Sequence, residues 1–165
     1  MKIKTIFTVL LCSLALISFQ ASATGKIVVY ETVTLNASAD TVWNTVGDFG
    51  GLHTWHPAVT STDLTGGNND AGSTRLLTLG DGAQITEILV DHNDDTMTYS
   101  YVIQKGPLPV KGYYSKIKVM PMGNGKAKLI WSSTFDADGV DDTTAYETIS
   151  GVYKGGFEAL TAKFK

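Results

Sequence analysis

Hydrophobic positions divide the chain into three regions with different spacing. Residues 6–19 form a mostly apolar run, apolar and polar residues alternate through much of 26–135, and a spacing of three to four residues begins near Asp141. Alternation is typical of half-buried strands, and the longer spacing is typical of an amphipathic helix. The pattern therefore predicts an apolar leader, a set of strands and one long C-terminal helix.

The last predicted element is a helix from Asp141 to Phe164. Its apolar face carries Ala145, Ile149, Val152, Gly156, Leu160 and Phe164. Glycines at its middle, Gly155 and Gly156, each cost about 1 kcal/mol relative to alanine. Either they permit close packing of the helix against a strand, or they leave space for a ligand beside Val152 and Gly156.

The alternating segments predict seven strands, with two short helices after the first. The first strand covers residues 26–35, and the short helices cover 38–46 and 49–55. The other strands cover 58–64, 73–79, 84–91, 96–103, 113–120 and 126–135. Their turns are rich in glycine, asparagine and aspartate. We expect an α+β fold, in which a curved seven-stranded antiparallel sheet surrounds the long C-terminal helix.

The alternation also predicts which strand residues face the helix. Lysines mark the solvent face of the last two strands, so the positions between them point inward. The inward positions with polar atoms are Tyr99, Tyr101, Tyr113, Ser115, Trp131 and Ser133. Buried aromatic residues with polar tips need hydrogen-bond partners. This face is therefore either a core with satisfied hydroxyl groups or the wall of a ligand cavity, with Trp55 at its rim.

An arginine and a glutamate share one predicted inward face. A two-residue turn would pair Arg75 with Ile88, whereas a three-residue loop at 80–82, with Gly82 in the left-handed region, pairs Arg75 with Glu87. The second register keeps leucines opposite apolar residues, so we prefer it. Two inward charges are costly to desolvate unless they pair. The pair is either a structural salt bridge or a catalytic acid–base pair, in which Glu87 moves a proton and Arg75 holds an anionic oxygen.

The first 23 residues have the pattern of a cleaved signal peptide. Lys2 and Lys4 precede the apolar run, and Ala21-Ser22-Ala23 is a small-residue cleavage site. Cleavage would leave residues 24–165 as one domain without Cys12, the only cysteine of the chain. We therefore expect a periplasmic or secreted domain with no disulfide and no cysteine-dependent chemistry.

Charge and motif content argue against several classes of partner. Without Lys2 and Lys4, 11 of the 13 basic residues remain against 16 acidic ones, which gives a net charge near −5 with no basic stripe. Nucleic acid is therefore a poor partner, and the apolar run is too short for stable membrane insertion. His53 and His56 have H-x-x-H spacing, with Asp48 close by. A metal site needs three or more converging ligands, and the other histidine, His92, lies in a distant turn, so no metal is expected. There is no glycine-rich phosphate loop, and no cofactor is expected.

Several motifs resemble the polyketide cyclase/dehydrase branch of the START-like (SRPBCC) superfamily. They are Val42-Trp43, the run from Asp48 to Pro57, Gly72-Ser73-Thr74-Arg75, Thr86-Glu87-Ile88-Leu89, Ser100-Tyr101, Gly106-Pro107-Leu108-Pro109-Val110 and Trp131-Ser132-Ser133-Thr134-Phe135. The resemblance covers essentially the whole chain after the leader. It implies a helix-grip fold, in which the curved sheet and the long helix enclose an apolar cavity.

Two groups of relatives imply different activities. The chain is similar to plant lachrymatory-factor synthases, whose catalytic arginine and glutamate match Arg75 and Glu87 by local motif, with a tyrosine near Tyr113 or Tyr114, although the spacing differs. It also resembles exported bacterial members that are linked to periplasmic methanol oxidation as accessory proteins. The leader makes the second resemblance the stronger one.

Three functions are therefore compatible with the sequence. The leading one is an exported domain for hydrophobic ligand binding, which encloses a small apolar or aromatic molecule between the sheet, the helix and a proline-containing loop at 105–112. The second is a cyclase-, dehydratase- or isomerase-type enzyme that uses Glu87 and Arg75. The third is a periplasmic accessory protein that acts on an oxidoreductase partner.

Overall fold

The computed structural model describes residues 25–165, so the predicted signal peptide, its cleavage site and Cys12 lie outside the described residues. Strand β1 (Ile27–Leu35) is followed by helix α1 (Ala39–Val46) and the 3-10 helix η1 (Phe49–Thr54). The remaining elements are β2 (Val59–Thr65), β3 (Thr74–Leu79), β4 (Gln84–Asn93), β5 (Thr98–Lys105), β6 (Val110–Gly123), β7 (Lys126–Ala137) and α2 (Asp142–Lys163). This is the predicted order of elements.

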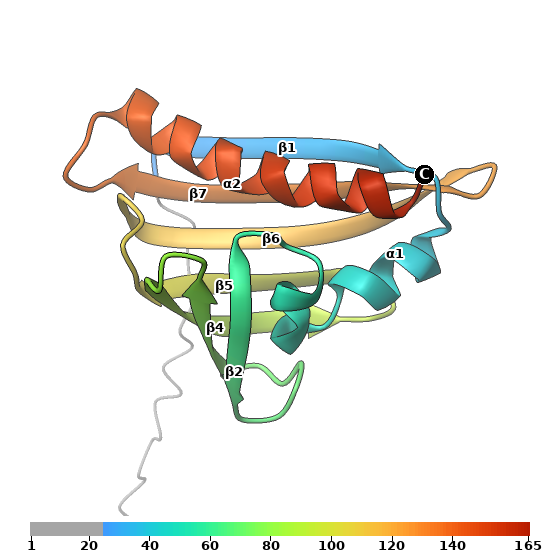
Figure 1. Cartoon of the computed structure of the whole chain (residues 1–165), viewed down its shortest axis with the longest axis horizontal. Coiled ribbons are helices and arrows are strands. Elements are labelled where there is room, and N and C mark those ends of the chain that lie inside the picture. Colours follow the sequence, from blue (N-terminus) through green and yellow to red (C-terminus); the bar gives the residue numbers. More distant parts are fainter. Residues whose placement is uncertain (1–24) are drawn as a thin grey trace, which may run out of the picture.

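All seven strands form one antiparallel sheet with the order β1-β7-β6-β5-β4-β3-β2. Strands β2 to β7 are a meander, and β1 joins the outer edge of β7, where Ile27 lies opposite Phe135. In Figure 1, β2 runs across the direction of β5 and β6 because the sheet is strongly curved, and α2 lies along β1 and β7. The arrangement is the predicted helix-grip fold.

The alternation identified the buried face of β6 and β7 correctly. The buried residues are Tyr113, Ser115, Ile117 and Val119 in β6, and Ala127, Leu129, Trp131, Ser133 and Phe135 in β7. The lysines at the alternating positions are exposed, as at Lys116 and Lys126, or half-buried, as at Lys118 and Lys128. A strand with one face on the core and one in solvent shows this period of two.

Helix α2 begins one residue after the predicted start because Asp141 is its N-cap. The Asp141 carboxylate accepts hydrogen bonds from the backbone N–H of Thr144 at 3.0 Å and from its hydroxyl group at 2.7 Å. Of the predicted apolar face, Ala145, Ile149, Gly156 and Leu160 are buried, and Val152 and Phe164 are half-buried. The helix also buries Tyr153 and Phe157, which the prediction omitted.

The proline-containing loop is shorter than predicted. Lys105 still pairs with Thr86 at the end of β5, and Val110 already pairs with Ala137 at the start of β6. Only residues 106–109 connect the two strands, because the residues on either side have backbone partners in the sheet. Within residues 25–165, no helix has both the length and the apolar character needed to cross a membrane.

Candidate functional site

The turn between β3 and β4 sets the register of the charged pair. Gly82 has a φ of 86°, and its N–H donates to the carbonyl of Leu79 at 2.9 Å, while the N–H of Leu79 donates to Ala83 O at 2.8 Å. This is the predicted three-residue loop, in which a glycine occupies the left-handed region without steric cost. Arg75 and Glu87 are consequently opposite each other.

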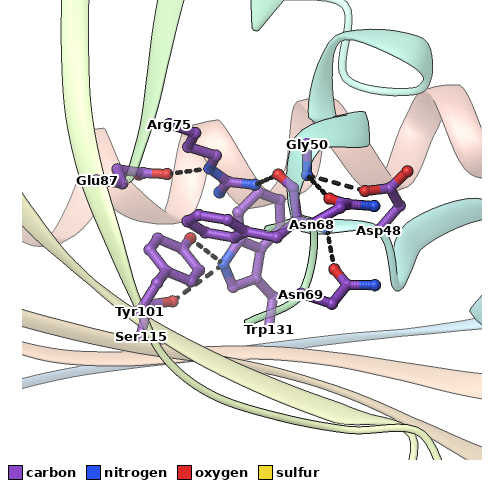
Figure 2. Close-up of polar contacts among 10 residues, drawn as sticks. Asp48, Gly50, Asn68, Asn69, Arg75, Glu87, Tyr101, Ser115 and Trp131 are labelled. Carbon is purple, nitrogen blue, oxygen red and sulfur yellow. Dashed lines mark hydrogen bonds and ion pairs between the residues drawn. The ribbon is translucent and has the colours of Figure 1, made fainter. Parts of the chain in front are cut away.

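The two side chains form a buried ion pair. Arg75 Nε donates to Glu87 Oε2 at 2.6 Å, and the side chains are 0% and 6% exposed. Arg75 Nη1 donates to the carbonyl of Phe49 at 2.7 Å, and the guanidinium group lies 4.2 Å from the Phe49 ring centroid and 5.0 Å from that of Tyr101 (Figure 2). Burial alone would lower the pKa of Arg75, but the carboxylate of Glu87 raises it, so the guanidinium group stays charged.

Loop side chains hold Phe49 in position for this contact. Asp48 is the N-cap of η1, and its carboxylate accepts from Gly50 N at 2.9 Å. From the β2–β3 loop, Asn68 Oδ1 also accepts from Gly50 N at 3.2 Å, and Asn69 Oδ1 accepts from Phe49 N at 2.9 Å (Figure 2). These bonds satisfy the N–H groups at the start of η1 and fix the backbone at Phe49, whose carbonyl accepts from Arg75 Nη1.

Glu87 presents its second oxygen to an internal cavity. Burial raises the pKa of Glu87, and Arg75 offsets this effect only in part. Oε2 is held by Arg75, whereas Oε1 makes no hydrogen bond with any other residue in 25–165. Glu87 lines the cavity and Arg75 does not, so Arg75 lies behind the carboxyl group.

The cavity lies between the curved sheet, the segment after η1 and helix α2, and has a volume of about 80 Å³. Its apolar wall includes Leu52, Val59, Leu77, Ile85 and Ile149. The lining residues that are half-buried or exposed mark its mouth, and these are Ala58, Leu79, Ile103, Leu108 and Val152. Polar atoms come from His56, Glu87, Tyr101, Tyr113, Trp131 and Tyr153. The cavity is thus an apolar space with a few hydrogen-bonding groups.

A hydrogen-bonded chain of side chains lies along one wall. The indole N–H of Trp131 donates to Tyr101 Oη at 3.0 Å and to Ser115 Oγ at 3.1 Å (Figure 2). Ser115 Oγ donates to the carbonyl of Ser132 at 3.0 Å and lies 3.3 Å from Tyr153 Oη. The polar atoms of Tyr101, Ser115, Trp131 and Tyr153 are therefore linked to one another, as buried polar groups generally are. Within residues 25–165, Tyr99 Oη and Ser133 Oγ on the same face have no hydrogen-bond partner.

Tyr113 and Tyr153 connect the sheet to the helix, because their hydroxyl oxygens are 2.5 Å apart. Burial raises the pKa of Tyr153 to about 12 and that of Tyr113 well above its ordinary value, so both stay protonated at neutral pH. The ring of Tyr153 also stacks on Trp131, with centroids 4.3 Å apart. Tyr153 was not among the residues predicted from the sequence, although its position four residues after Ile149 was a usable signal.

The structure brings together only some of the predicted ligand-binding residues. Tyr101, Tyr113, Trp131 and Val152 line the cavity. Tyr99, Ser115 and Ser133 are buried on the same inner face but do not line it. Sequence periodicity does not separate these two groups, because both have the same parity along their strands.

Gly156 and Trp55 do not line the cavity, and the expected space at Gly156 is filled. A Cβ at Gly156 would stand 2.8 Å from His56 Cδ2 and 3.0 Å from Trp55 Cζ3. His56 Nε2 is 2.9 Å from the carbonyl of Val152, and its Nδ1 accepts from Ala58 N at 3.3 Å. The close-packing interpretation therefore holds, but the partners are the side chains that follow η1 rather than a strand.

The histidines differ in how far they are buried. His53 is exposed and His56 is buried, while His92 Nε2 is bonded to the carbonyl of Gly47 at 2.8 Å. Burial lowers the pKa of His56, which keeps its imidazole neutral. Across residues 25–165, no three His, Cys, Asp or Glu side chains come together in a way that could hold a metal ion.

Comparison with known proteins gives a family and a set of similar structures. The family model described as polyketide cyclase / dehydrase and lipid transport matches residues 26–165. An uncharacterised protein from Bacillus thuringiensis is 32% identical with a TM-score of 0.79, over 84% of this chain and 98% of that one. The protein XoxI from Bacillus cereus is 32% identical with a TM-score of 0.78, over 83% and 94% of the two chains.

A more distant structure shares the fold. A START superfamily protein from Mycobacterium smegmatis is 17% identical with a TM-score of 0.70, over 83% of this chain and 96% of that one. No curated protein that was compared matches the chain.

Proposed function

The chain belongs to the polyketide cyclase / dehydrase and lipid transport family, and from that premise we propose that its cavity binds a compact, mostly apolar molecule. The observation that carries this proposal is the apolar cavity with one buried carboxyl group, Glu87, in its wall. Apolar pockets with a few convergent polar groups and a perturbed pKa are the usual form of small-molecule sites.

The cavity volume limits the size of the ligand. Drug-sized ligands occupy pockets of roughly 300–1,000 Å³, and an engineered cavity of about 150 Å³ holds benzene. The cavity in this protein measures about 80 Å³. A molecule the size of one small ring would therefore fill it and extend into the mouth near Leu108.

Thermal unfolding in the presence of small cyclic hydrocarbons tests the proposal. A molecule that binds only the folded state raises the unfolding temperature as its concentration increases. Leu108→Trp would place a larger side chain at the mouth and should abolish this shift. Val140→Trp, at a position that is 40% exposed, should preserve it. A wild-type protein that shows no shift with any probe, and carries no bound molecule in native mass spectrometry, would contradict the proposal.

An enzyme of the cyclase, dehydratase or isomerase type is the second candidate, and the free oxygen of Glu87 favours it. A carboxyl group with a raised pKa can give and take a proton closer to neutral pH. Arg75 contacts the other carboxylate oxygen, so in this geometry it would act on a ligand through Glu87. Glu87→Gln should then abolish turnover while ligand binding persists. A variant that retains both would leave ligand binding as the function.

Export and partner binding also belong to this proposal. We expect the natural protein to begin at Thr24 after removal of the signal peptide and to be found in a periplasmic or secreted fraction, which N-terminal sequencing of the protein from its host would test. The accessory role on an oxidoreductase stays a prediction. Val28 and Tyr30, each 59% exposed on the outer side of β1, are the first positions to change in testing it.

A further inference from the structure

We propose that the ligand of the cavity carries a hydroxyl group, which accepts a hydrogen bond from the phenol of Tyr101 and donates one to the carboxylate of Glu87. This inference rests on the proposed function, since it names the chemistry of the molecule that the same cavity takes. It follows from two groups in the cavity wall: a hydroxyl hydrogen that has no acceptor and a carboxylate oxygen that has no donor.

The hydroxyl hydrogen of Tyr101 has no acceptor within the described part of the chain. The one hydrogen-bond partner of Tyr101 Oη there is the indole N–H of Trp131, at 3.0 Å. An indole N–H can only donate, so Tyr101 Oη is the acceptor in that bond. Tyr101 is 1% exposed and lines the cavity. A ligand oxygen in the cavity would satisfy its hydrogen, which otherwise stays unpaired at a cost in free energy.

The other two phenols of the cavity wall, Tyr113 and Tyr153, already donate their hydroxyl hydrogens to neighbouring side chains. The hydroxyl of Ser115 donates to the carbonyl of Ser132, because a carbonyl can only accept. Ser115 Oγ therefore accepts from Tyr153 at 3.3 Å, and Tyr153 Oη in turn accepts from Tyr113 at 2.5 Å. With these directions, each hydrogen bond among Ser115, Tyr153 and Tyr113 has one donor and one acceptor. It leaves Tyr101 as the phenol in the cavity wall with a hydrogen to donate.

The matching acceptor is Glu87 Oε1. Glu87 pairs with Ile103, and Tyr101 lies two residues before Ile103 on β5, so Glu87 and Tyr101 are diagonal neighbours on one face. Diagonal neighbours in a sheet are about 7–8 Å apart, which long side chains can bridge through one intervening atom. In Figure 2 both side chains extend from neighbouring strands to the same side of the sheet. Arg75 occupies Oε2, so Oε1 is the oxygen that remains for a ligand.

One hydroxyl group satisfies both protein groups at once. A ketone oxygen would accept from Tyr101 but leave Glu87 Oε1 without a donor, and a hydrocarbon would satisfy neither. With the small volume and apolar wall of the cavity, the class that fits is a compact alcohol or phenol.

Three probes of nearly equal size separate these cases: cyclopentanol, cyclopentanone and cyclopentane. Their dissociation constants would be measured on the purified protein by calorimetric titration. We expect Tyr101→Phe to weaken cyclopentanol binding by about tenfold, the usual effect of one hydrogen bond, and to change cyclopentane binding by less than about twofold because the ring is retained. The control Tyr146→Phe, at a position that is 40% exposed, should change neither.

A second variant tests the acceptor. Glu87→Gln replaces a carboxylate oxygen by an amide that can donate, so the preference for cyclopentanol over cyclopentanone should fall or reverse. If cyclopentane binds and Tyr101→Phe weakens the three probes equally or not at all, the hydroxyl inference is overturned while the proposed cavity function stands. If none of the three probes binds the wild-type protein, the hydroxyl inference is overturned, and the proposed cavity function is overturned with it if native mass spectrometry also finds no bound molecule.

Discussion

Gly156 of α2 lies directly against His56, and the missing side chain is what admits the imidazole to the helix backbone. A Cβ on Gly156 would stand 2.8 Å from His56 Cδ2, and His56 Nε2 lies 2.9 Å from the carbonyl of Val152. The glycine therefore ties the segment after η1 to the long helix, next to the cavity. A larger side chain at this position would therefore displace His56 rather than extend into the cavity.

We predict that Gly156→Ala destabilises the protein. Overpacking a filled site costs about 1–3 kcal/mol. A cost near the middle of that range, about 2 kcal/mol, exceeds the gain of about 1 kcal/mol from alanine in a helix. The matched control is Gly151→Ala, where a Cβ meets nothing within 4 Å, so that variant should be more stable by about 0.5–1 kcal/mol. Urea unfolding measures both changes. Equal stabilisation by the two variants would show that the contact with His56 is absent.

Breaking the buried ion pair should be far more costly than breaking a surface pair. Arg75→Met leaves Glu87 buried without its partner, so we expect a loss of about 3–5 kcal/mol in the free energy of unfolding. The double variant Arg75→Met/Glu87→Leu should recover much of that loss, because it removes both charges.

The surface pair between Lys26 and Asp142 is the control for this prediction. Its side chains are 67% and 56% exposed, and the charged atoms are 3.1 Å apart. Exposed pairs contribute about 0–1 kcal/mol, so Lys26→Met should have little effect. The prediction is wrong if Arg75→Met and Lys26→Met destabilise the protein equally in denaturant titrations.

His56 makes stability depend on pH. Burial lowers its pKa below the ordinary 6.5, the charge of Arg75 adds to this, and the hydrogen bond with Val152 opposes it. The unfolded chain therefore binds a proton at a higher pH than the folded one. Its contribution to stability is present above the unfolded value of 6.5 and is lost as the pH falls toward the folded pKa, with a slope of at most about 1.4 kcal/mol per pH unit.

Unfolding free energies at a series of pH values around 6 check this dependence. The variant His56→Gln should flatten the slope, because glutamine does not titrate. The variant His53→Gln should keep the slope, because His53 is exposed. A slope that persists unchanged in His56→Gln would assign the pH dependence to other groups.

Tyr153→Phe should destabilise the protein through one lost hydrogen-bond acceptor. The hydroxyl of Tyr113 would then be buried without its partner at 2.5 Å, at a cost of about 1–3 kcal/mol. The stacking on Trp131 would survive, because phenylalanine keeps the ring. Tyr146→Phe is the surface control. Thermal and urea unfolding of the two variants should differ clearly, and equal stability would argue against the Tyr113–Tyr153 bond.

The pairing of Arg75 with Glu87 was already determined by the sequence. Only one of the two possible loops keeps Leu77 and Leu79 opposite apolar residues, and Gly82 permits that loop, with an observed φ of 86°. Alternation likewise predicted the buried residues of β6 and β7, and motifs along the chain indicated the family. These features depend on local periodicity and turn chemistry, which a sequence carries directly.

The tertiary structure alone decided what fills the space between the sheet and the helix. It placed Arg75 behind Glu87 rather than in the cavity, His56 against Gly156, and Tyr153 over Trp131. Periodicity reports the side of an element on which a residue lies, but not which residue from another element meets it there. The cavity volume and the undonated hydroxyl hydrogen of Tyr101 depend on these contacts between elements. Both are set by the distances between side chains that pack from different elements.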